Sequence, residues 1–379
     1  MVLQTAGIAR HMDKHEHWLL ELTRTPTASG REDRVIEWVR RWAARRRNVA
    51  LYTDRFGNLE LRRRRSRSTK PIYFIAHMDH PAFVVRKIIS PNEVKAEFRG
   101  GVHGEFFNGS NVMLHHDDKP PRRGVVQCTA KGPTRDPQGE KIVSVRFGAP
   151  AEAGPGDVLT WDTGRQHIRT GLLHTLSADN LAGVAAAISA FDEIHKSKAA
   201  RRPDVRVLLT RCEEIGLVGA TAVCQTALLP KRARLIVLEN SRSFPESPIG
   251  GGPIVRIGDR LSTFDPDLTR SLCGIAQGIE QCDPAFNWQR KLMVGGSCEA
   301  TAFCAFGYTT GCVCLPLGNY HNMDPFKKRI AAEYISLNDY RGLVRLLIAV
   351  GRGMDKPKST PSLKTQLTRI LARHRHLLK

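Results

Sequence analysis

The sequence places imidazole and carboxylate side chains at the ends of several predicted strands and at the start of one predicted helix. They are His77, Asp79, Asp179, Glu213, Glu214, Glu239 and His321. In an open α/β sheet, ligands gather at the carboxyl ends of the strands, so these side chains can converge in one crevice. Imidazoles combined with carboxylates suit zinc and similar divalent ions. The pattern therefore predicts a metal centre.

Five of these side chains are assigned as metal ligands. They are His77, Asp179, Glu214, Glu239 and His321. Five ligands are too many for one four-coordinate ion that keeps a position open, but they suit two ions if one carboxylate bridges them. Two ions about 3.5–4 Å apart can activate a hydroxide and polarise a carbonyl under attack. The set predicts a hydrolytic centre with two divalent ions, for which zinc, cobalt and manganese all fit.

Two further carboxylates are assigned to supporting roles. Asp79 follows His77 by two residues and can accept the second ring N–H of that ligand, as carboxylates commonly do at metal sites. Glu213 stands beside the ligand Glu214 and is assigned as the general base that takes a proton from the attacking water.

Each residue also has an ordinary structural explanation when it is considered alone. Short His-x-Asp tripeptides are frequent by chance, and a Glu-Glu pair usually lies in a solvated turn. Asp179 could serve only as a helix N-cap, Glu239 as a loop acid and His321 as part of a surface turn. The functional interpretation depends on the whole set, with each member at the end of an element.

The N-terminal part predicts a helix, a hairpin and a buried strand. Residues 29–32, Ser-Gly-Arg-Glu, have the pattern of a capping box. Apolar residues then recur at helical spacing, at Val35, Trp38, Val39 and Trp42. Residues 49–61 predict a hairpin, with the arginine-rich run at 62–67 in its outgoing loop, and residues 71–76 predict a buried strand.

Residues 90–168 differ in sequence pattern from the flanking segments. Short strand-like runs separated by Gly, Pro and Asp predict a small all-β barrel or sandwich. After residue 175, helices are expected at 181–194, 217–228, 268–281, 299–306 and 339–350, and strands at 205–210, 235–238 and 312–315. This alternation predicts an α/β sheet with helices on both faces, into which the β segment is inserted.

The composition is that of a large folded chain. The 379 residues are 41% hydrophobic, enough for one large domain or two unequal ones. No run approaches the ~20 apolar residues that span a bilayer, and the N-terminus becomes charged too early for a secretory signal. The nine cysteines are scattered without a CxxC pair, so we expect a cytoplasmic protein without a zinc ribbon.

The chain is strongly basic. Lys and Arg total 58 against 37 Asp and Glu, which gives a net charge of +21 and favours anionic partners. The basic clusters at 62–67 and 356–379 lack interleaved aromatic residues, which disfavours nucleic-acid binding as the main function. The tail carries Leu363, Leu367, Ile370 and Leu371 among basic residues. It fits a short basic amphipathic helix that packs on the body, a partner or a membrane surface, or it stays disordered.

Several motifs together resemble the glutamyl or tetrahedral aminopeptidases, a family of dinuclear zinc peptidases. They lie within roughly residues 15–352 and include HMDHPAF, SADNLAGVAAA, CEEIGLVGA, VLEN, GGGPIVRIGD and LGNYHN. The resemblance implies a three-layer α/β/α catalytic domain formed by residues 1–89 and 169–352. It also implies an inserted barrel-like β domain at 90–168, used for homo-oligomerisation, and leaves a basic tail at 353–379 outside the family pattern.

The resemblance also implies how the ligands divide. His77, Asp179 and Glu239 would hold one ion, and Asp179, Glu214 and His321 the other, so that Asp179 bridges the two. The implied activity is the removal of N-terminal residues from short peptides inside an assembly of dimers.

Three features depart from the family pattern. His80 stands where an acidic residue is usual, Glu239 stands where Asp is usual, and Gly-Gly-Ser-Cys-Glu-Ala at 295–300 replaces Gly-Gly-Thr-Asp-Ala. The last change bears on substrate choice, because that stretch lies near the substrate pocket in the family. Two alternatives remain open. One is another amide hydrolase of the clan, such as a dipeptidase, carboxypeptidase or deacylase; the other is a non-catalytic basic binding protein on the same scaffold.

Overall fold

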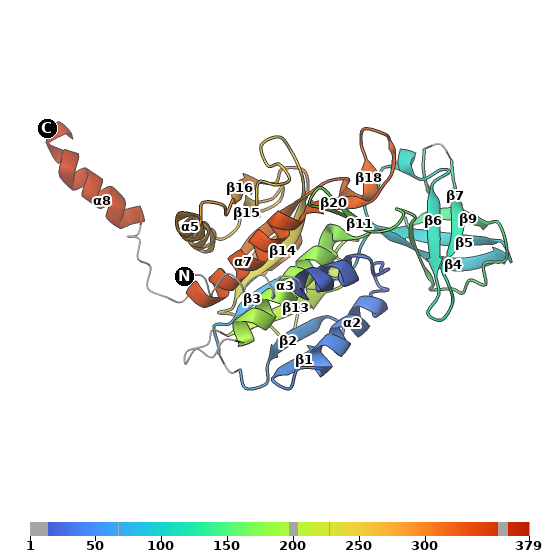
Figure 1. The fold of residues 1–379 in the computed structure, drawn as a ribbon, viewed down its shortest axis with the longest axis horizontal. Coiled ribbons are helices and arrows are strands. Elements are labelled where there is room, and N and C mark those ends of the chain that lie inside the picture. The colour runs from blue at the N-terminus through green and yellow to red at the C-terminus, as the bar shows by residue number, and fades with distance from the viewer. Residues whose placement is uncertain are drawn as a thin grey trace.

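The computed structural model describes residues 14–66, 68–129, 131–196, 204–226, 228–354 and 363–378. Its larger part is built on an eight-stranded sheet with the order β1-β2-β13-β3-β14-β17-β15-β16 (Figure 1). The bounds are β1 Val49–Thr53, β2 Leu59–Arg63, β3 Ile72–His77, β13 Val205–Thr210, β14 Arg234–Arg242, β15 Ile254–Gly258, β16 Gln289–Leu292 and β17 Thr309–Leu317. The neighbours β13, β3, β14 and β17 run parallel, so their carboxyl ends meet at one edge.

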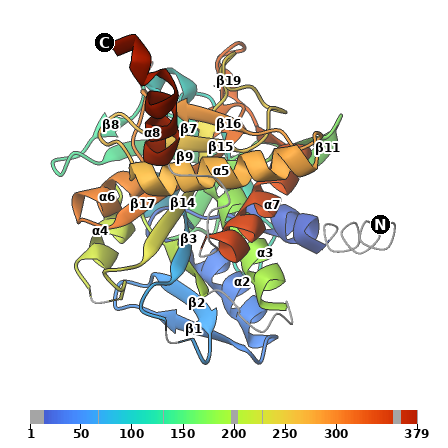
Figure 2. The ribbon, with the colours of Figure 1, turned by 90° about the vertical axis from the view of Figure 1, so that its left-hand side faces the viewer.

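Helices cover both faces of this sheet because its central strands are apolar on both sides. In β3, Ile72, Phe74 and Ala76 pack into one hydrophobic cluster, whereas Tyr73 and Ile75 pack into another on the opposite face. The first cluster includes α2 Asp33–Ala44, α3 Ala178–Lys196, α5 Pro266–Cys282 and α7 Leu337–Gly353. The second includes α4 Val218–Cys224 and α6 Glu299–Ala305, and Figure 2 shows α4 and α6 across the sheet from α2, α3 and α7.

A second body, drawn at the right of Figure 1, is all-β. Its strands are β4 Ala82–Ser90, β5 Glu93–Arg99, β6 Asn111–His115, β7 Arg122–Gln127, β8 Thr134–Arg135, β9 Lys141–Phe147 and β10 Val158–Trp161. They form one sheet in the order β5-β4-β10-β6-β7-β9-β8, and an additional β5–β9 pairing closes it into a barrel. Edge-to-face contacts among Phe83, Phe98, Phe107 and Trp161 fill its centre. The predicted α/β/α domain with an inserted β barrel is confirmed.

Small sheets connect the two bodies. β11 His167–Arg169, β12 Leu172–Thr175 and β20 Glu333–Ser336 form one, and β18 Met323–Asp324 pairs with β19 Arg329–Ile330. Ser336 is the N-cap of α7, because its Oγ accepts a hydrogen bond from the Asp339 amide.

Two local predictions were wrong. The capping box does not form: α2 begins at Asp33, Glu32 makes no side-chain cap bond, and the Ser29 hydroxyl donates instead to Asp79 at 2.6 Å. The arginine-rich run is not wholly a loop either, because Arg62 and Arg63 belong to β2 and pair with β1.

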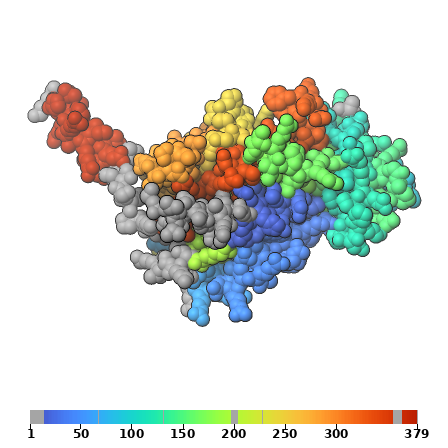
Figure 3. All heavy atoms as spheres, in the orientation of Figure 1, coloured from blue at the N-terminus to red at the C-terminus, as the bar shows by residue number. Residues whose placement is uncertain are grey.

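The tail forms a helix, which is one of the alternatives that its sequence left open. α8 spans Leu363–His374 and continues into η3, Arg375–Leu378. Figure 3 shows α8 extending from the larger body on the side opposite the barrel. No helix among the described segments combines the length and apolar character needed to cross a membrane.

Candidate metal centre

The predicted ligands gather at the carboxyl edge of the parallel strands. His77 ends β3, Glu213 and Glu214 follow β13, and Glu239 lies in β14. Asp179 stands at the start of α3, and His321 lies in η2, Tyr320–Asn322, after β17. This is the crevice where an open α/β sheet collects ligands.

One group of side chains surrounds the His77 imidazole. His77 Nε2 lies 3.3 Å from Glu239 Oε1, 3.6 Å from Asp179 Oδ1 and 3.9 Å from Glu213 Oε2. Ligand-capable atoms of His77, Asp179 and Glu214 lie within 4.8 Å of one another, as do those of His77, Glu213 and Glu239. The side chains are thus close enough for shared coordination of a cation.

A second group surrounds His321. Its Nε2 lies 3.2 Å from Glu214 Oε1 and 3.8 Å from Asp179 Oδ2. The two oxygens of Asp179 therefore face different imidazoles. Asp179 Oδ1 is buried and has no hydrogen-bond partner among the described residues, which is the state expected of an oxygen that binds a cation.

The charges at this edge require a positive counterpart. Burial by itself lowers the pKa of each ligand histidine, but nearby carboxylates outweigh it, led by Glu213 at His77 and by Glu214 at His321. They hold the pKa of His77 well above its usual value and raise that of His321 to about 9. Protonated imidazoles or divalent cations can supply the required charge, and the donor set fits divalent cations such as zinc.

Glu213 has the environment of a proton-transfer group. Burial raises the pKa of its carboxyl well above the usual range, and Glu214 and Glu239 add to the rise while His77 opposes it. A raised pKa lets a carboxyl hold a proton more readily, which suits a group that accepts and returns one.

Asp79 supports more of the site than the predicted contact with His77. His77 Nδ1 donates to the Asp79 carbonyl oxygen at 3.1 Å and lies 3.4 Å from Oδ1. The Asp79 carboxylate also accepts the backbone N–H groups of Glu213 at 3.0 Å and Glu214 at 3.1 Å. With the Ser29 hydroxyl as a third donor, Asp79 fixes the turn that presents both glutamates.

Glu333 is a supporting residue that the sequence reasoning missed. It is fully buried. Its Oε2 accepts the Asp179 amide at 3.0 Å and its Oε1 accepts the His321 amide at 2.9 Å. One carboxylate thus joins the backbones of two candidate ligands. Its position four residues before the start of α7, at Leu337, gave no signal in a single sequence.

The loops around the ligands have unusual backbone conformations. Cys212, His321 and Asn322 adopt φ angles of 54°, 55° and 62°, a left-handed region that clusters at functional sites. His80, one of the departures from the family pattern, helps to hold this arrangement. Its Nε2 lies 2.9 Å from Asn322 Oδ1 and its Nδ1 contacts the Asp179 carbonyl oxygen.

The barrel also reaches the site. The carbonyl oxygen of Gly101, in the loop after β5, accepts a hydrogen bond from His321 Nδ1 at 2.5 Å. A ligand histidine usually donates its second ring nitrogen to such an acceptor, which fixes the ring orientation. The inserted body therefore contributes directly to the position of a candidate ligand.

Glu299, the acidic residue of the altered Gly-Gly stretch, lies beneath the site and not at its surface. It begins α6 and is fully buried. Neither carboxylate oxygen meets a hydrogen-bond donor in good geometry among the described residues. Burial raises the pKa of Glu299 to about 7, so its carboxyl holds a proton more readily than a surface glutamate does.

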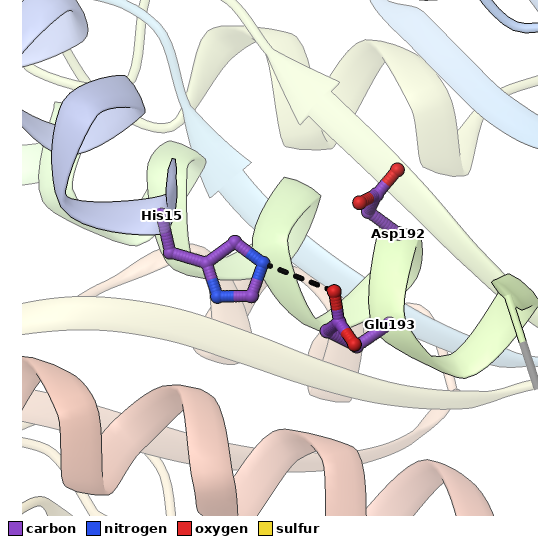
Figure 4. A group of neighbouring side chains, drawn as sticks. All are labelled: His15, Asp192 and Glu193. Carbon is purple, nitrogen blue, oxygen red and sulfur yellow. Dashed lines mark ion pairs between the residues drawn. The ribbon is translucent and has the colours of Figure 1, made fainter. Parts of the chain in front are cut away.

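A separate acidic group lies near the C-terminal end of α3 (Figure 4). His15 Nε2 is 3.5 Å from Glu193 Oε1, with Asp192 beside them. The neighbouring Asp192 already pairs with Lys14 at 2.5 Å and Arg46 at 3.0 Å. These cations supply the positive charge that a metal would bring, so the group fastens the N-terminal helical segment to α3.

Comparison with known proteins gives one family and several similar folds. The profile of the M42 glutamyl aminopeptidase family matches residues 57–337. The TET1 peptidase of Pyrococcus horikoshii, which can assemble into a tetrahedron or a large octahedral shell, is 22% identical with a TM-score of 0.72, over 89% of this chain and 99% of that chain. The aminopeptidase APDkam598 of the archaeon Desulfurococcus kamchatkensis is 20% identical with a TM-score of 0.72, over 92% and 99%. The comparison with curated proteins gives no match.

The solved structures establish the likeness of the fold, and the family profile establishes membership. The matched segment includes every candidate ligand, from His77 to His321. It also includes both the barrel and most of the α/β/α domain. The chain therefore belongs to the M42 glutamyl aminopeptidase family of metal-dependent peptidases.

Proposed function

We propose that the chain is a dinuclear aminopeptidase that uses zinc, cobalt or manganese to hydrolyse N-terminal residues from peptides. The observation that carries the proposal is the position of Asp179, whose Oδ1 lies 3.6 Å from His77 Nε2 and whose Oδ2 lies 3.8 Å from His321 Nε2. A carboxylate between two imidazoles supports a bridging role. His77 and Glu239 would complete one ligand set, and Glu214 and His321 the other.

The bound ions would supply a Lewis acid for the scissile carbonyl and lower the pKa of a water molecule. The chain's own residues handle the proton. Glu213 accepts a proton from the water that attacks the carbonyl carbon, and it returns this proton to the nitrogen as the C–N bond breaks. Asp79 holds the turn that aims Glu213, through the N–H···O bonds described above.

Replacing Glu213 with Gln tests the assignment of the base. Gln keeps the size of the side chain but cannot take up the proton, so kcat should fall by roughly 10²- to 10⁴-fold while the metal content stays the same. Glu140→Gln, at an exposed position in the barrel, is the matched control. A Glu213→Gln enzyme that works at the wild-type rate would remove Glu213 from the mechanism.

The direction of cleavage is tested separately. A panel of aminoacyl p-nitroanilides with free N-termini should be hydrolysed, whereas the same compounds with an acetylated N-terminus and N-acyl amino acids should not. Preferential cleavage of N-acyl amino acids would instead assign a deacylase activity within the same fold.

We also infer that the chain assembles into a homo-oligomer through the inserted barrel. The support is the presence of the barrel and the assembly of a structural neighbour, the TET1 peptidase, into a tetrahedron or a large octahedral shell. Light scattering of the purified chain should give a mass well above that of the 42.2 kDa monomer. A monodisperse monomer that retains full peptidase activity would refute the assembly and leave the assignment of the site unchanged.

A further inference from the structure

The C-terminal helix is amphipathic and its apolar side is open to solvent. α8 has 12 residues. Ile370 and Leu371 lie three and four residues after Leu367, so the three share one face, and Leu367, Ile370 and Leu371 are 56%, 57% and 52% exposed. Leu377 and Leu378 in η3 are 70% and 76% exposed. Exposed leucine and isoleucine side chains are thus concentrated in this segment.

Basic residues flank the apolar stripe, and acidic residues are missing from the sequence of the tail. After Asp355 the chain contains no Asp or Glu, and its charged residues are Lys356, Lys358, Lys364, Arg369, Arg373, Arg375 and Lys379. Lys364, Arg369 and Arg373 lie in α8 and are exposed. No ion pair joins these three side chains to any other described residue, so their charge remains available for a partner.

Two physical arguments bear on the partner of α8. The first indicates that the helix needs a partner, and the second disfavours another copy of this chain. A helix of this length is marginal in water by itself, since most helical stability comes from burial of an apolar face. The chain as a whole carries a net charge of +21, so docking of a basic helix on another copy meets electrostatic repulsion.

We propose that α8 and η3 bind the surface of an anionic lipid membrane. Phosphate and carboxylate groups of such a surface attract the lysine and arginine side chains, while the boundary between headgroups and acyl chains accepts the leucine and isoleucine side chains. Nucleic acid offers the same charge but nothing apolar to cover the stripe. The combination of both features on one helix is what selects the lipid surface.

This inference does not depend on the proposed peptidase mechanism. It gains strength from the proposed assembly, because several tails on one particle would act together and raise the overall affinity without any new contact. Recruitment of the enzyme to a membrane surface would then be a property of the tail, separable from hydrolysis.

The test is flotation of the full chain with vesicles, in matched sets of variants. The wild type is expected to float with phosphatidylglycerol–phosphatidylcholine vesicles and to remain behind with phosphatidylcholine alone. Arg369→Glu with Arg373→Glu should lower binding at least tenfold, and so should Leu367→Ser with Ile370→Ser and Leu371→Ser. The control is Arg47→Glu with Arg65→Glu, an equal charge change at exposed positions on the body. Its vesicle binding should stay within threefold of that of the wild type.

Four results of the flotation and mass measurements would overturn the proposal. The first is equal binding to neutral and anionic vesicles, and the second is a loss of vesicle binding in the Arg47/Arg65 control as large as that in the tail variants. The third is wild-type vesicle binding by either tail variant, and the fourth is a drop in particle mass when the three apolar residues are replaced. The second result would assign binding to overall charge, and the last would assign the stripe to a contact between copies. A tail-dependent gel shift with duplex RNA that ignores the serine changes would assign a nucleic-acid partner instead.

Discussion

Replacing Glu333 with Gln is a direct test of how the candidate ligands are positioned. The Glu333 carboxylate accepts the amide N–H of Asp179 at 3.0 Å and that of His321 at 2.9 Å, in a fully buried place. Gln has nearly the same shape, but only one of its two terminal atoms can accept a hydrogen bond. One of the two amides must therefore lose its partner or rotate away.

The expected magnitude follows from these contacts. A hydrogen bond to a charged group contributes about 1.5–3 kcal/mol, and a buried donor left unpaired costs about 1–3 kcal/mol. We expect Glu333→Gln to lower the free energy of unfolding by roughly 2–3 kcal/mol. Because the freed amide belongs to a candidate ligand, metal affinity should also fall, by about 10- to 100-fold as for other residues that orient ligands.

The assay is titration of metal-free protein with zinc against a chelating dye, together with urea unfolding of the same samples. Glu140→Gln again serves as the control, since its side chain is exposed. The decisive measurement is the zinc affinity of protein that is fully folded by circular dichroism. If folded Glu333→Gln binds zinc as tightly as the wild type, the claim that Glu333 positions Asp179 and His321 is wrong.

Three further outcomes are expected. Asp79→Asn should weaken zinc binding and lower kcat together, because Asn cannot accept from Ser29 and both glutamate amides as the carboxylate does; a change in KM alone would contradict this. Removal of the ions with a chelator should lower the melting temperature, since ions present at about 100 times their Kd stabilise the folded state by about 2.7 kcal/mol; an unchanged melting curve would argue against a bound metal. Burial lowers the pKa of His115 from 6.5 to about 4, so the folded state binds fewer protons than the unfolded state between these pH values. The contribution of this histidine to stability is therefore complete above pH 6.5 and is lost as the pH falls toward 4. The loss is no more than about 3 kcal/mol. In urea titrations, His115→Gln should make the free energy of unfolding depend less on pH between pH 7.5 and pH 5. An equal pH dependence in the variant and the wild type would assign the acid sensitivity to other groups.

The sequence was sufficient to locate the candidate ligands because they follow buried strands. An apolar run such as that of β3 can be recognised without a structure, and parallel strands must end at the same edge. His77, Glu214 and Glu239 could therefore be placed together from their order and from the alternation of elements.

The supporting contacts could not be predicted, because they depend on tertiary geometry. Ser29 has the local pattern of a cap, but a buried carboxylate at Asp79 offers its hydroxyl a stronger partner than the helix does. Glu333 reaches Asp179 because β20 pairs with β12 just ahead of α3. No local pattern indicates such a pairing between segments that lie more than a hundred residues apart.

The hydrogen bond between Gly101 and His321 means that the barrel is not an interchangeable module. A loop of the inserted body holds the ring of a candidate ligand in the other body. A chimaera that exchanges the barrel for that of a relative would inherit a correct fold and still misplace one imidazole unless the loop came with it. If the barrel mediates the proposed assembly, a change in subunit packing that moves this loop would move the His321 ring through a single carbonyl oxygen. In the proposed enzyme, metal affinity would then depend on assembly, and subunit dissociation would weaken metal binding without unfolding either body.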